Sequence, residues 1–215
     1  YDKRSGRYVL LRPNDKTKDQ TYMLYKLTQN QLSRTLMPLA DYTKEEVREV
    51  SICKLKLYEG AVVYDIGSGT GSIAVEIAGL SDKIKVFAVE HKAEAVSLIA
   101  GNKKKFELDN IEIVSGTAPD ALENLPVPTH AFIGGSGGKM KEILSALYQK
   151  NPHMRIVMNA ISMETICEIK EVLSTFSIQN AEVVQMQVSR AKSVGAYHLM
   201  QAENPVWICA FDFCG

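Results

Sequence analysis

The 215-residue sequence has no long apolar run and no unusual use of cysteine. No run approaches the roughly 20 consecutive apolar residues that a membrane-spanning helix needs, and no segment resembles a signal peptide. The four cysteines form no C-x-x-C pair and lie at no histidine ligand spacing: Cys53, Cys167, Cys209 and Cys214. We therefore expect a cytoplasmic protein with reduced thiols, no membrane partner and no bound metal.

The sequence also lacks an excess of charge of either sign, with 25 Lys and Arg against 25 Asp and Glu. The balance is uneven, since residues 1–60 contain 12 basic and 8 acidic side chains, and residues 61–215 contain 13 and 17. Proteins that bind nucleic acid usually have a strongly basic surface. The composition therefore predicts no nucleic-acid partner.

From residue 61 onward, apolar runs alternate with amphipathic segments. The pattern predicts strands at 61–66, 84–90, 111–114, 129–134 and 155–160, and helices at 71–80, 92–107, 117–124, 137–150 and 162–175. Such alternation is typical of a mostly parallel, doubly wound α/β sheet. Two β-rich runs, 181–191 and 195–212, follow without a helix between them, which predicts a C-terminal antiparallel hairpin.

The length suits one well-filled α/β domain with a short extension. We interpret residues 1–40 as an N-terminal extension or linker remnant, because they show only weak patterns. The capping box Thr43-x-x-Glu46 then predicts a helix start. We accordingly place the folded domain at residues 41–215.

A glycine-rich loop follows the first strong strand, in the segment AVVYDIGSGTG at residues 61–71. The strand ends near Asp65, and Glu90 ends the next apolar run. Alternate glycines let backbone approach a ligand, and the following helix start offers N–H groups to an anion. An acidic side chain about 20 residues later is the usual partner of a ribose diol in doubly wound folds.

The spacing of this loop separates two cofactor classes. Dinucleotide enzymes use G-x-G-x-x-G, whereas this loop reads Asp-x-Gly-x-Gly-x-Gly. The pattern resembles motif I of class I S-adenosylmethionine-dependent methyltransferases, with Glu90 in the place of their ribose-binding acid. We therefore predict a Rossmann-like class I methyltransferase fold with S-adenosylmethionine as cofactor.

Two further loops follow the third and fourth strands. Residues 115–122 read SGTAPDAL, and residues 132–138 read FIGGSGG. The second loop lies at the carboxyl end of a strand, where open α/β sheets place their substrates. It offers space, backbone N–H groups and one hydroxyl, which suits a large flat ligand edged with carboxylates.

These segments together resemble the decarboxylating precorrin-6 methyltransferases of corrin (cobalamin) biosynthesis, which methylate carbon 15 of the macrocycle. The resemblance covers roughly residues 38–212. It depends on Thr43 to Arg48, Asp65 to Gly71, Gly116 to Leu122 and Ile133 to Gly138, and on the tail around Gly195 to His198 and Asn204 to Val206. The combination of the Gly-Gly-Ser-Gly-Gly loop with the Thr-Lys-Glu-Glu-Val-Arg helix start is much narrower than the first glycine loop alone.

The resemblance implies which residues contact the cofactor, and the open loop and the carboxylates of the implied substrate add candidates for the second site. Those expected to contact S-adenosylmethionine are Thr43, Asp65, Gly67, Ser68, Gly69, Thr70, Gly71, Glu90, His91, Thr117 and Ala118. Those expected to contact the tetrapyrrole are Gly134, Gly135, Ser136, Gly137, Gly138, Lys139, Arg190 and Tyr197. Thr117 stands where the family commonly has Asp, so the role of that Asp at the adenine amine does not transfer.

The catalytic residues are left unassigned, since the reduced macrocycle that the resemblance implies as substrate supplies its own enamine-like nucleophile. The family also implies a homo-oligomer, a tetramer, and allows fusion to or association with a carbon-5 methyltransferase. Two alternatives remain open: a tRNA adenine methyltransferase, and a non-catalytic S-adenosylmethionine-binding module of a fused corrin enzyme. The sequence does not distinguish a cobalt-containing from a cobalt-free substrate.

Overall fold

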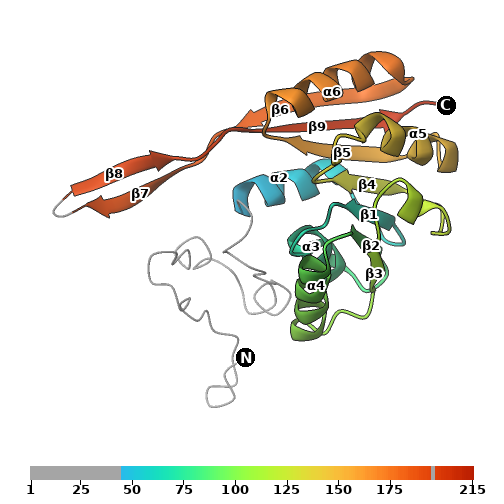
Figure 1. The fold of residues 1–215 in the computed structure, drawn as a ribbon, viewed down its shortest axis with the longest axis horizontal. Coiled ribbons are helices and arrows are strands. Elements are labelled where there is room, and N and C mark those ends of the chain that lie inside the picture. Colours follow the sequence, from blue (N-terminus) through green and yellow to red (C-terminus); the bar gives the residue numbers. More distant parts are fainter. Residues whose placement is uncertain (1–44, 195–196) are drawn as a thin grey trace.

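The computed structural model describes residues 45–194 and 197–215, which contain a mostly parallel sheet between two layers of helices (Figure 1). The predicted Thr43 site residue and the 1–40 extension lie outside the described residues. The helices are α2 (Glu45–Leu55), α3 (Ser72–Leu80), α4 (Ala93–Lys105), the 3₁₀ turn η3 (Asp120–Leu122), α5 (Met140–Lys150) and α6 (Met163–Thr175). The strands are β1 (Val62–Ile66), β2 (Lys85–Glu90), β3 (Ile111–Ser115), β4 (His130–Ile133), β5 (Arg155–Ala160), β6 (Ile178–Met186), β7 (Ser189–Val194), β8 (Tyr197–Ala202) and β9 (Val206–Phe213).

Seven strands form the main sheet in the order β3-β2-β1-β4-β5-β9-β6. The first five are parallel, and β9 lies antiparallel between β5 and β6. The chain reverses its direction of winding between β1 and β4, which makes this the topological switch point of the sheet. The predicted doubly wound fold with an antiparallel C-terminal hairpin is confirmed.

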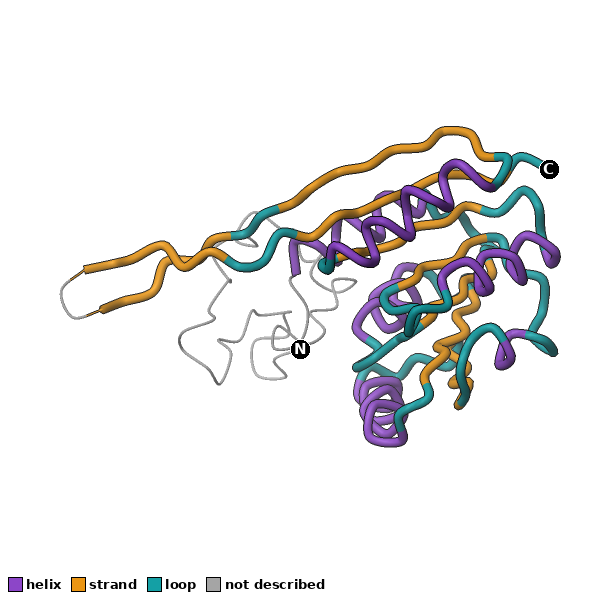
Figure 2. Tube along the Cα trace, turned by 45° about the horizontal axis from the view of Figure 1, so that its top comes forward, coloured by secondary structure: helices purple, strands orange, loops and turns teal. Residues whose placement is uncertain are grey.

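Two apolar layers bury the sheet on both faces. On one face, α2, α3 and α4 cover strand side chains such as Val63, and on the other, α5 and α6 cover strand side chains such as Tyr64. Figures 1 and 2 show the two helix layers. Strands covered on both faces need apolar residues throughout, so the central strands read as unbroken apolar runs. Asp65 interrupts the apolar run of β1 on the face that α3 covers. A carboxylate buried there is unfavourable unless hydrogen bonds compensate for its lost hydration.

The C-terminal hairpin is divided into two parts. β6 and β9 belong to the main sheet, whereas β7 and β8, among the described strands, pair only with each other and project from the carboxyl edge as a two-stranded arm (Figures 1 and 2). Pro205 lies between β8 and β9 and has no N–H for a ladder bond. The sequence predicted two strands here rather than four, because β6 and β7 form one nearly continuous β-rich run and β8 and β9 form another.

One predicted helix is wrong. The segment 117–124 forms only the single turn η3, and Pro119, Pro126 and Pro128 leave little room for a longer helix. The other predicted elements after residue 61 fall within three residues of the observed bounds.

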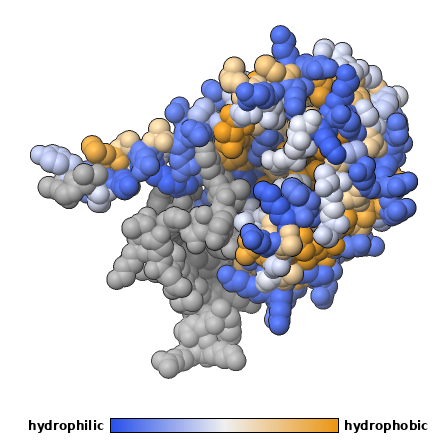
Figure 3. Space-filling model, in the orientation of Figure 1, coloured by the Kyte–Doolittle hydropathy of each residue, from blue (hydrophilic) through white to orange (hydrophobic). Residues whose placement is uncertain are grey.

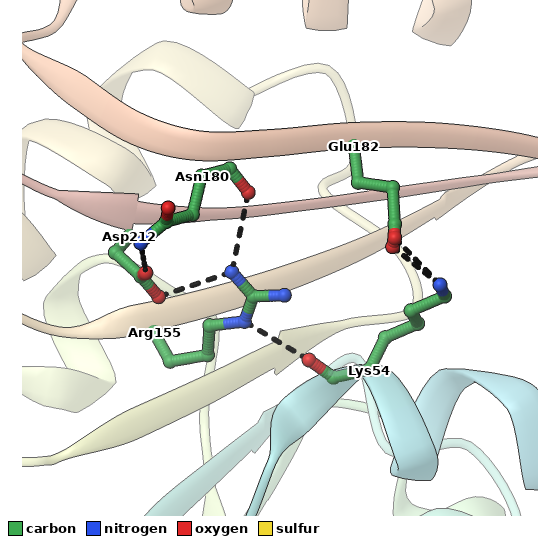
Figure 4. Close-up of polar contacts among 5 residues, drawn as sticks. All are labelled: Lys54, Arg155, Asn180, Glu182 and Asp212. Carbon is green, nitrogen blue, oxygen red and sulfur yellow. Dashed lines mark hydrogen bonds and ion pairs between the residues drawn. The ribbon is translucent and has the colours of Figure 1, made fainter.

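A buried arginine fixes α2 to the amino edge of the sheet, opposite the loops that follow the parallel strands (Figure 4). Arg155 Nε donates to the Lys54 carbonyl at 2.9 Å, and its Nη1 donates to Asp212 Oδ1 at 3.1 Å. Asn180 Nδ2 donates to Asp212 Oδ2 at 2.8 Å, and Lys54 pairs with Glu182. This Arg155 cluster joins α2 to β5, β6 and β9, and so holds α2 in its place beside the central strands.

Candidate active site

The two glycine loops meet at the switch point of the sheet. The Gly134 N–H donates to the Ile66 carbonyl at 3.0 Å, so the loop after β4 starts against the end of β1. A Cβ added at Gly67 would lie 2.7 Å from the Gly135 carbonyl oxygen, and Gly67 has a φ of +69°. Glycine is therefore required at 67 both by conformation and by this close backbone contact.

Asp65, near the end of β1, holds the first glycine loop through hydrogen bonds. Its Oδ2 accepts hydrogen bonds from Ser68 Oγ at 2.6 Å and from the Ala74 N–H at 3.2 Å. Helix α3 has no side-chain cap of its own at Gly71, so the Asp65 carboxylate caps it from the strand. Asp65 is only 1% exposed, and its Oδ1 has no hydrogen-bond partner within the described parts of the chain.

Burial and, to a smaller extent, the neighbouring Glu90 carboxylate together raise the pKa of Asp65 to about 6, against the hydrogen bonds from Ser68 and Ala74, which act to lower it. A buried carboxyl with a displaced pKa beside a ligand loop is typical of a functional site.

Glu90 holds the same loop from the adjacent strand β2. Its Oε2 accepts from the Gly69 N–H at 2.9 Å, and its Oε1 accepts from the N–H groups of His91 and Lys92, each at 2.9 Å. Burial acts to raise the pKa of Glu90, but the three backbone donors outweigh it, so the pKa lies below its ordinary value. An ionised carboxylate oxygen with one bond keeps acceptor capacity, so Oε2 can also receive a ligand hydroxyl.

Helix α4 supplies support that the sequence analysis did not identify. Asn102 Nδ2 donates to the Thr70 carbonyl at 2.9 Å. A Cβ added at Gly71 would lie 2.9 Å from Cγ1 of Ile99, so Ile99 packs closely against the loop at this glycine. In the sequence, Asn102 precedes three lysines at a polar helix end and so resembles a solvent-exposed residue, although the structure buries it. No sequence signal could have found it.

The loop after β3 lies along the same edge of the sheet. The Gly116 N–H donates to the Glu90 carbonyl at 3.0 Å, which connects this loop to the end of β2. Thr117 is exposed, whereas Ala118 is buried in the apolar cluster that includes Leu122. Their predicted contact with adenine stays a prediction.

The loop after β4 is open to solvent. Gly134, Gly135, Gly137, Gly138 and Lys139 are exposed, and Ser136 is half-buried. A Cβ added at Gly135 would meet nothing within 4 Å, and the φ of Gly135 lies outside the left-handed region. Among the residues that the structure describes, neither packing nor backbone conformation requires glycine at 135, so the loop leaves space over its backbone at this point.

Arg190 and Tyr197, the other two predicted substrate residues, lie on the projecting arm. Arg190 pairs with Glu46 of α2 at 2.8 Å and with Glu203 at 3.4 Å. Tyr197 is 75% exposed at the start of β8, near the tip of the arm. The structure brings together the residues of the two glycine loops with Asp65 and Glu90, but places Tyr197 away from them.

The strand order, the glycine loop after β1 and the acid after β2 define a class I methyltransferase. A family model described as the precorrin methyltransferase domain matches residues 40–211. The chain belongs to this precorrin methyltransferase family.

Similar proteins agree with this membership. A Pyrobaculum calidifontis protein named as a probable cobalt-precorrin-6B C(15)-methyltransferase (decarboxylating) is 36% identical, over 77% of this chain and 86% of its own length. A Salmonella typhimurium cobalt-precorrin-6B C(15)-methyltransferase (decarboxylating) is 32% identical, over 78% and 87%. The crystal structure of a precorrin-6y C5,15-methyltransferase from Geobacter metallireducens superposes with a TM-score of 0.74 at 33% identity, covering 83% of this chain and 93% of that chain.

A second family model, described as the tRNA methyl transferase HUP domain, matches residues 1–58. The match overlaps the precorrin model over residues 40–58 and includes neither glycine loop. It covers too little of the chain to assign a second family.

Proposed function

We propose that this protein methylates carbon 15 of a precorrin-6 type tetrapyrrole with S-adenosylmethionine and removes carbon dioxide from the ring C acetate, as a step in cobalamin biosynthesis. The family membership supports this function, and so do the names of the relatives. The observation that carries the proposal is the backbone contact between Gly67 and Gly135, because it joins a cofactor loop to an open loop at the switch point.

The residues around the first loop fit S-adenosylmethionine. Glu90 would accept from the ribose hydroxyls, while the loop backbone from Gly67 to Gly71 would cover the methionine part. The open space over Gly69, where an added Cβ meets nothing within 4 Å, leaves room for this ligand. The cofactor supplies an electrophilic methyl group when bound.

The second loop would receive the acceptor. A flat ring can lie against backbone at Gly135 without meeting a side chain, and Lys139 at the start of α5 can face a ring carboxylate. Positioning of donor and acceptor can contribute up to about 7–11 kcal/mol to such a transfer. The protein therefore needs to orient the substrate and exclude water more than it needs an acid or base.

The direct test is an assay with labelled S-adenosylmethionine and precorrin-6B, run with and without cobalt in the macrocycle. We expect label transfer and release of carbon dioxide with one of the two forms. Absence of both reactions with both forms would reject the function. Comparison of the two forms would also decide between a cobalt-containing and a cobalt-free substrate.

A tRNA adenine methyltransferase is the alternative enzyme. The match of residues 1–58 to a model named for tRNA methyl transfer does not extend to the glycine loops, so it does not favour tRNA as the acceptor of this domain. Label transfer to tRNA, with none to the tetrapyrrole, would support this alternative. Cofactor binding without any transfer would support the non-catalytic module.

We further propose a homo-oligomer, expected to be a tetramer, that works in the cytoplasm. The arm supports association, because Leu199 and Met200 are 57% and 66% exposed on a two-stranded ribbon. Figure 3 shows hydrophobic side chains on the surface of this arm. Light scattering after size exclusion should give four subunits, and Leu199→Glu should lower that number. Leu80→Glu is the matched control, since Leu80 is 59% exposed on α3 and should leave the assembly intact. A monomeric wild type would refute the proposal.

The division into an extension at 1–40 and a domain at 41–215 also remains a proposal, supported by the start of the precorrin match at residue 40. A carbon-5 methyltransferase, fused or associated, is the proposed partner. Four free cysteines support a reducing location. Among the helices that the structure describes, none is long and apolar enough to cross a bilayer.

A further inference from the structure

The first glycine loop is held by two carboxylates that come from neighbouring strands. Asp65 at the end of β1 binds Ser68, and Glu90 at the end of β2 binds Gly69, so adjacent loop residues have acidic partners on two sides. Glu90 receives three backbone bonds, whereas one oxygen of Asp65 has no partner among the described residues, although the side chain is 1% exposed. A buried acceptor without a partner is unfavourable, so its presence beside a ligand loop indicates a role in the site.

Asp65 is too deeply buried to touch a ligand, so it can act on a ligand only through the loop that it holds and through its charge. Its Oδ2 fixes Ser68 and also caps α3 at Ala74, so the same atom sets both the loop and the helix start. Ionised Asp65 and ionised Glu90 repel each other at this position. A cation bound over the first glycine loop would offset that repulsion and favour ionised Asp65.

We propose that Asp65 is a positioning residue that makes binding of the cationic cofactor proton-linked, and thereby distinguishes S-adenosylmethionine from its uncharged-sulfur product. The proposal rests on the proposed cofactor and concerns the same site. With Asp65 ionised, Ser68 and Ala74 are held and the sulfonium has a buried counter-charge. With Asp65 protonated, that counter-charge is lost. The product S-adenosylhomocysteine has a neutral thioether, so it gains less from ionised Asp65.

The groups that face Asp65 come from four parts of the chain. Ser68 approaches from its own loop, Ala74 from α3, and Glu90 from β2, while its register partner on β4 is Phe132, which does not titrate. His91 lies 3.2 Å from Glu90 Oε1 through Nδ1 and is 58% exposed. His91 is therefore in direct contact with the proposed ribose acid, and its contribution to cofactor affinity has to be separated experimentally.

The experiment measures the affinity of both ligands by calorimetry at pH 5, 6 and 7. For wild type we expect S-adenosylmethionine to bind about tenfold more weakly at pH 5 than at pH 7, and S-adenosylhomocysteine to weaken by about threefold or less, because each unit of pKa change on binding is a factor of ten. Asp65→Asn should remove most of the pH dependence for S-adenosylmethionine. His91→Gln should keep it, and Ser68→Ala should weaken both ligands while keeping the slope.

Proton release by wild type, measured at pH 6 in two buffers, keeps the test independent of how well Asp65→Asn folds. Release with S-adenosylmethionine and much less with S-adenosylhomocysteine supports the proposal, provided that His91→Gln still releases protons. No release, equal release for the two ligands, or loss of release in His91→Gln would overturn it. If neither ligand binds wild type at any pH, the proposed cofactor itself is refuted.

Discussion

His130 should make the protein less stable in mild acid. This histidine opens β4 and is 3% exposed, with Thr129 Oγ1 2.8 Å from its Nδ1 and the Tyr58 ring in edge contact at 5.2 Å. Burial, together with the Arg155 guanidinium, lowers its pKa from 6.5 to about 4, against Asp212, which acts to raise it. The folded protein therefore resists protonation at His130 and the unfolded chain does not.

The sign follows from these two values. The stabilising contribution is complete above pH 6.5 and is lost as the pH falls through the folded pKa near 4. Linkage gives a loss of about 2 kcal/mol between pH 7 and pH 5. Asp65 acts in the opposite sense: its pKa is raised from 3.8 to about 6, so lowering the pH from 7 to 5 adds about 1 kcal/mol.

Urea denaturation of the ligand-free protein between pH 5 and pH 7 tests both contributions. In His130→Asn the free energy of unfolding should fall less steeply with acid than in wild type, by about 2 kcal/mol over this range. In Asp65→Asn it should fall more steeply, by about 1 kcal/mol. Any constant change in stability cancels, because only the slope matters. Profiles of wild type and His130→Asn that run parallel would refute the reasoning.

Three further predictions concern packing and capping. Gly67→Ala should lower stability by about 1–3 kcal/mol, since its Cβ meets the Gly135 backbone at a positive φ, whereas Gly135→Ala should stay within about 0.5 kcal/mol in the same thermal-shift measurement; equal effects would contradict the loop contact. Arg155→Met should cost about 3–5 kcal/mol in urea denaturation, because it leaves a carboxylate and two carbonyls of the Arg155 cluster without their donor; a loss below about 1 kcal/mol would argue against the cluster. Ser162→Ala should cost about 1 kcal/mol, since Ser162 caps α6 at the Thr165 N–H; an unchanged unfolding midpoint would show that the cap contributes nothing.

Local patterns in the sequence were sufficient for most of the fold. The strand runs are unbroken because both faces of the sheet are buried, and the apolar spacing in α5 and α6 reflects one covered face. The pattern failed at 117–124, where prolines restrict the chain to one turn. It also failed to divide the C-terminal hairpin, since strand propensity is the same whether or not a layer covers the strand.

The sequence alone predicted the class of cofactor site, because glycine spacing and an acid at 90 are local patterns typical of backbone approach to a ligand and of hydroxyl binding. It also predicted the two loops separately, but not their relation. Only the tertiary structure decided that Gly67 and Gly135 touch, that Asn102 of α4 holds the first loop, and that Asp65 has a buried oxygen unpaired among the described residues. Such contacts join residues tens of positions apart, and they depend on packing distances that no local pattern of residue types encodes.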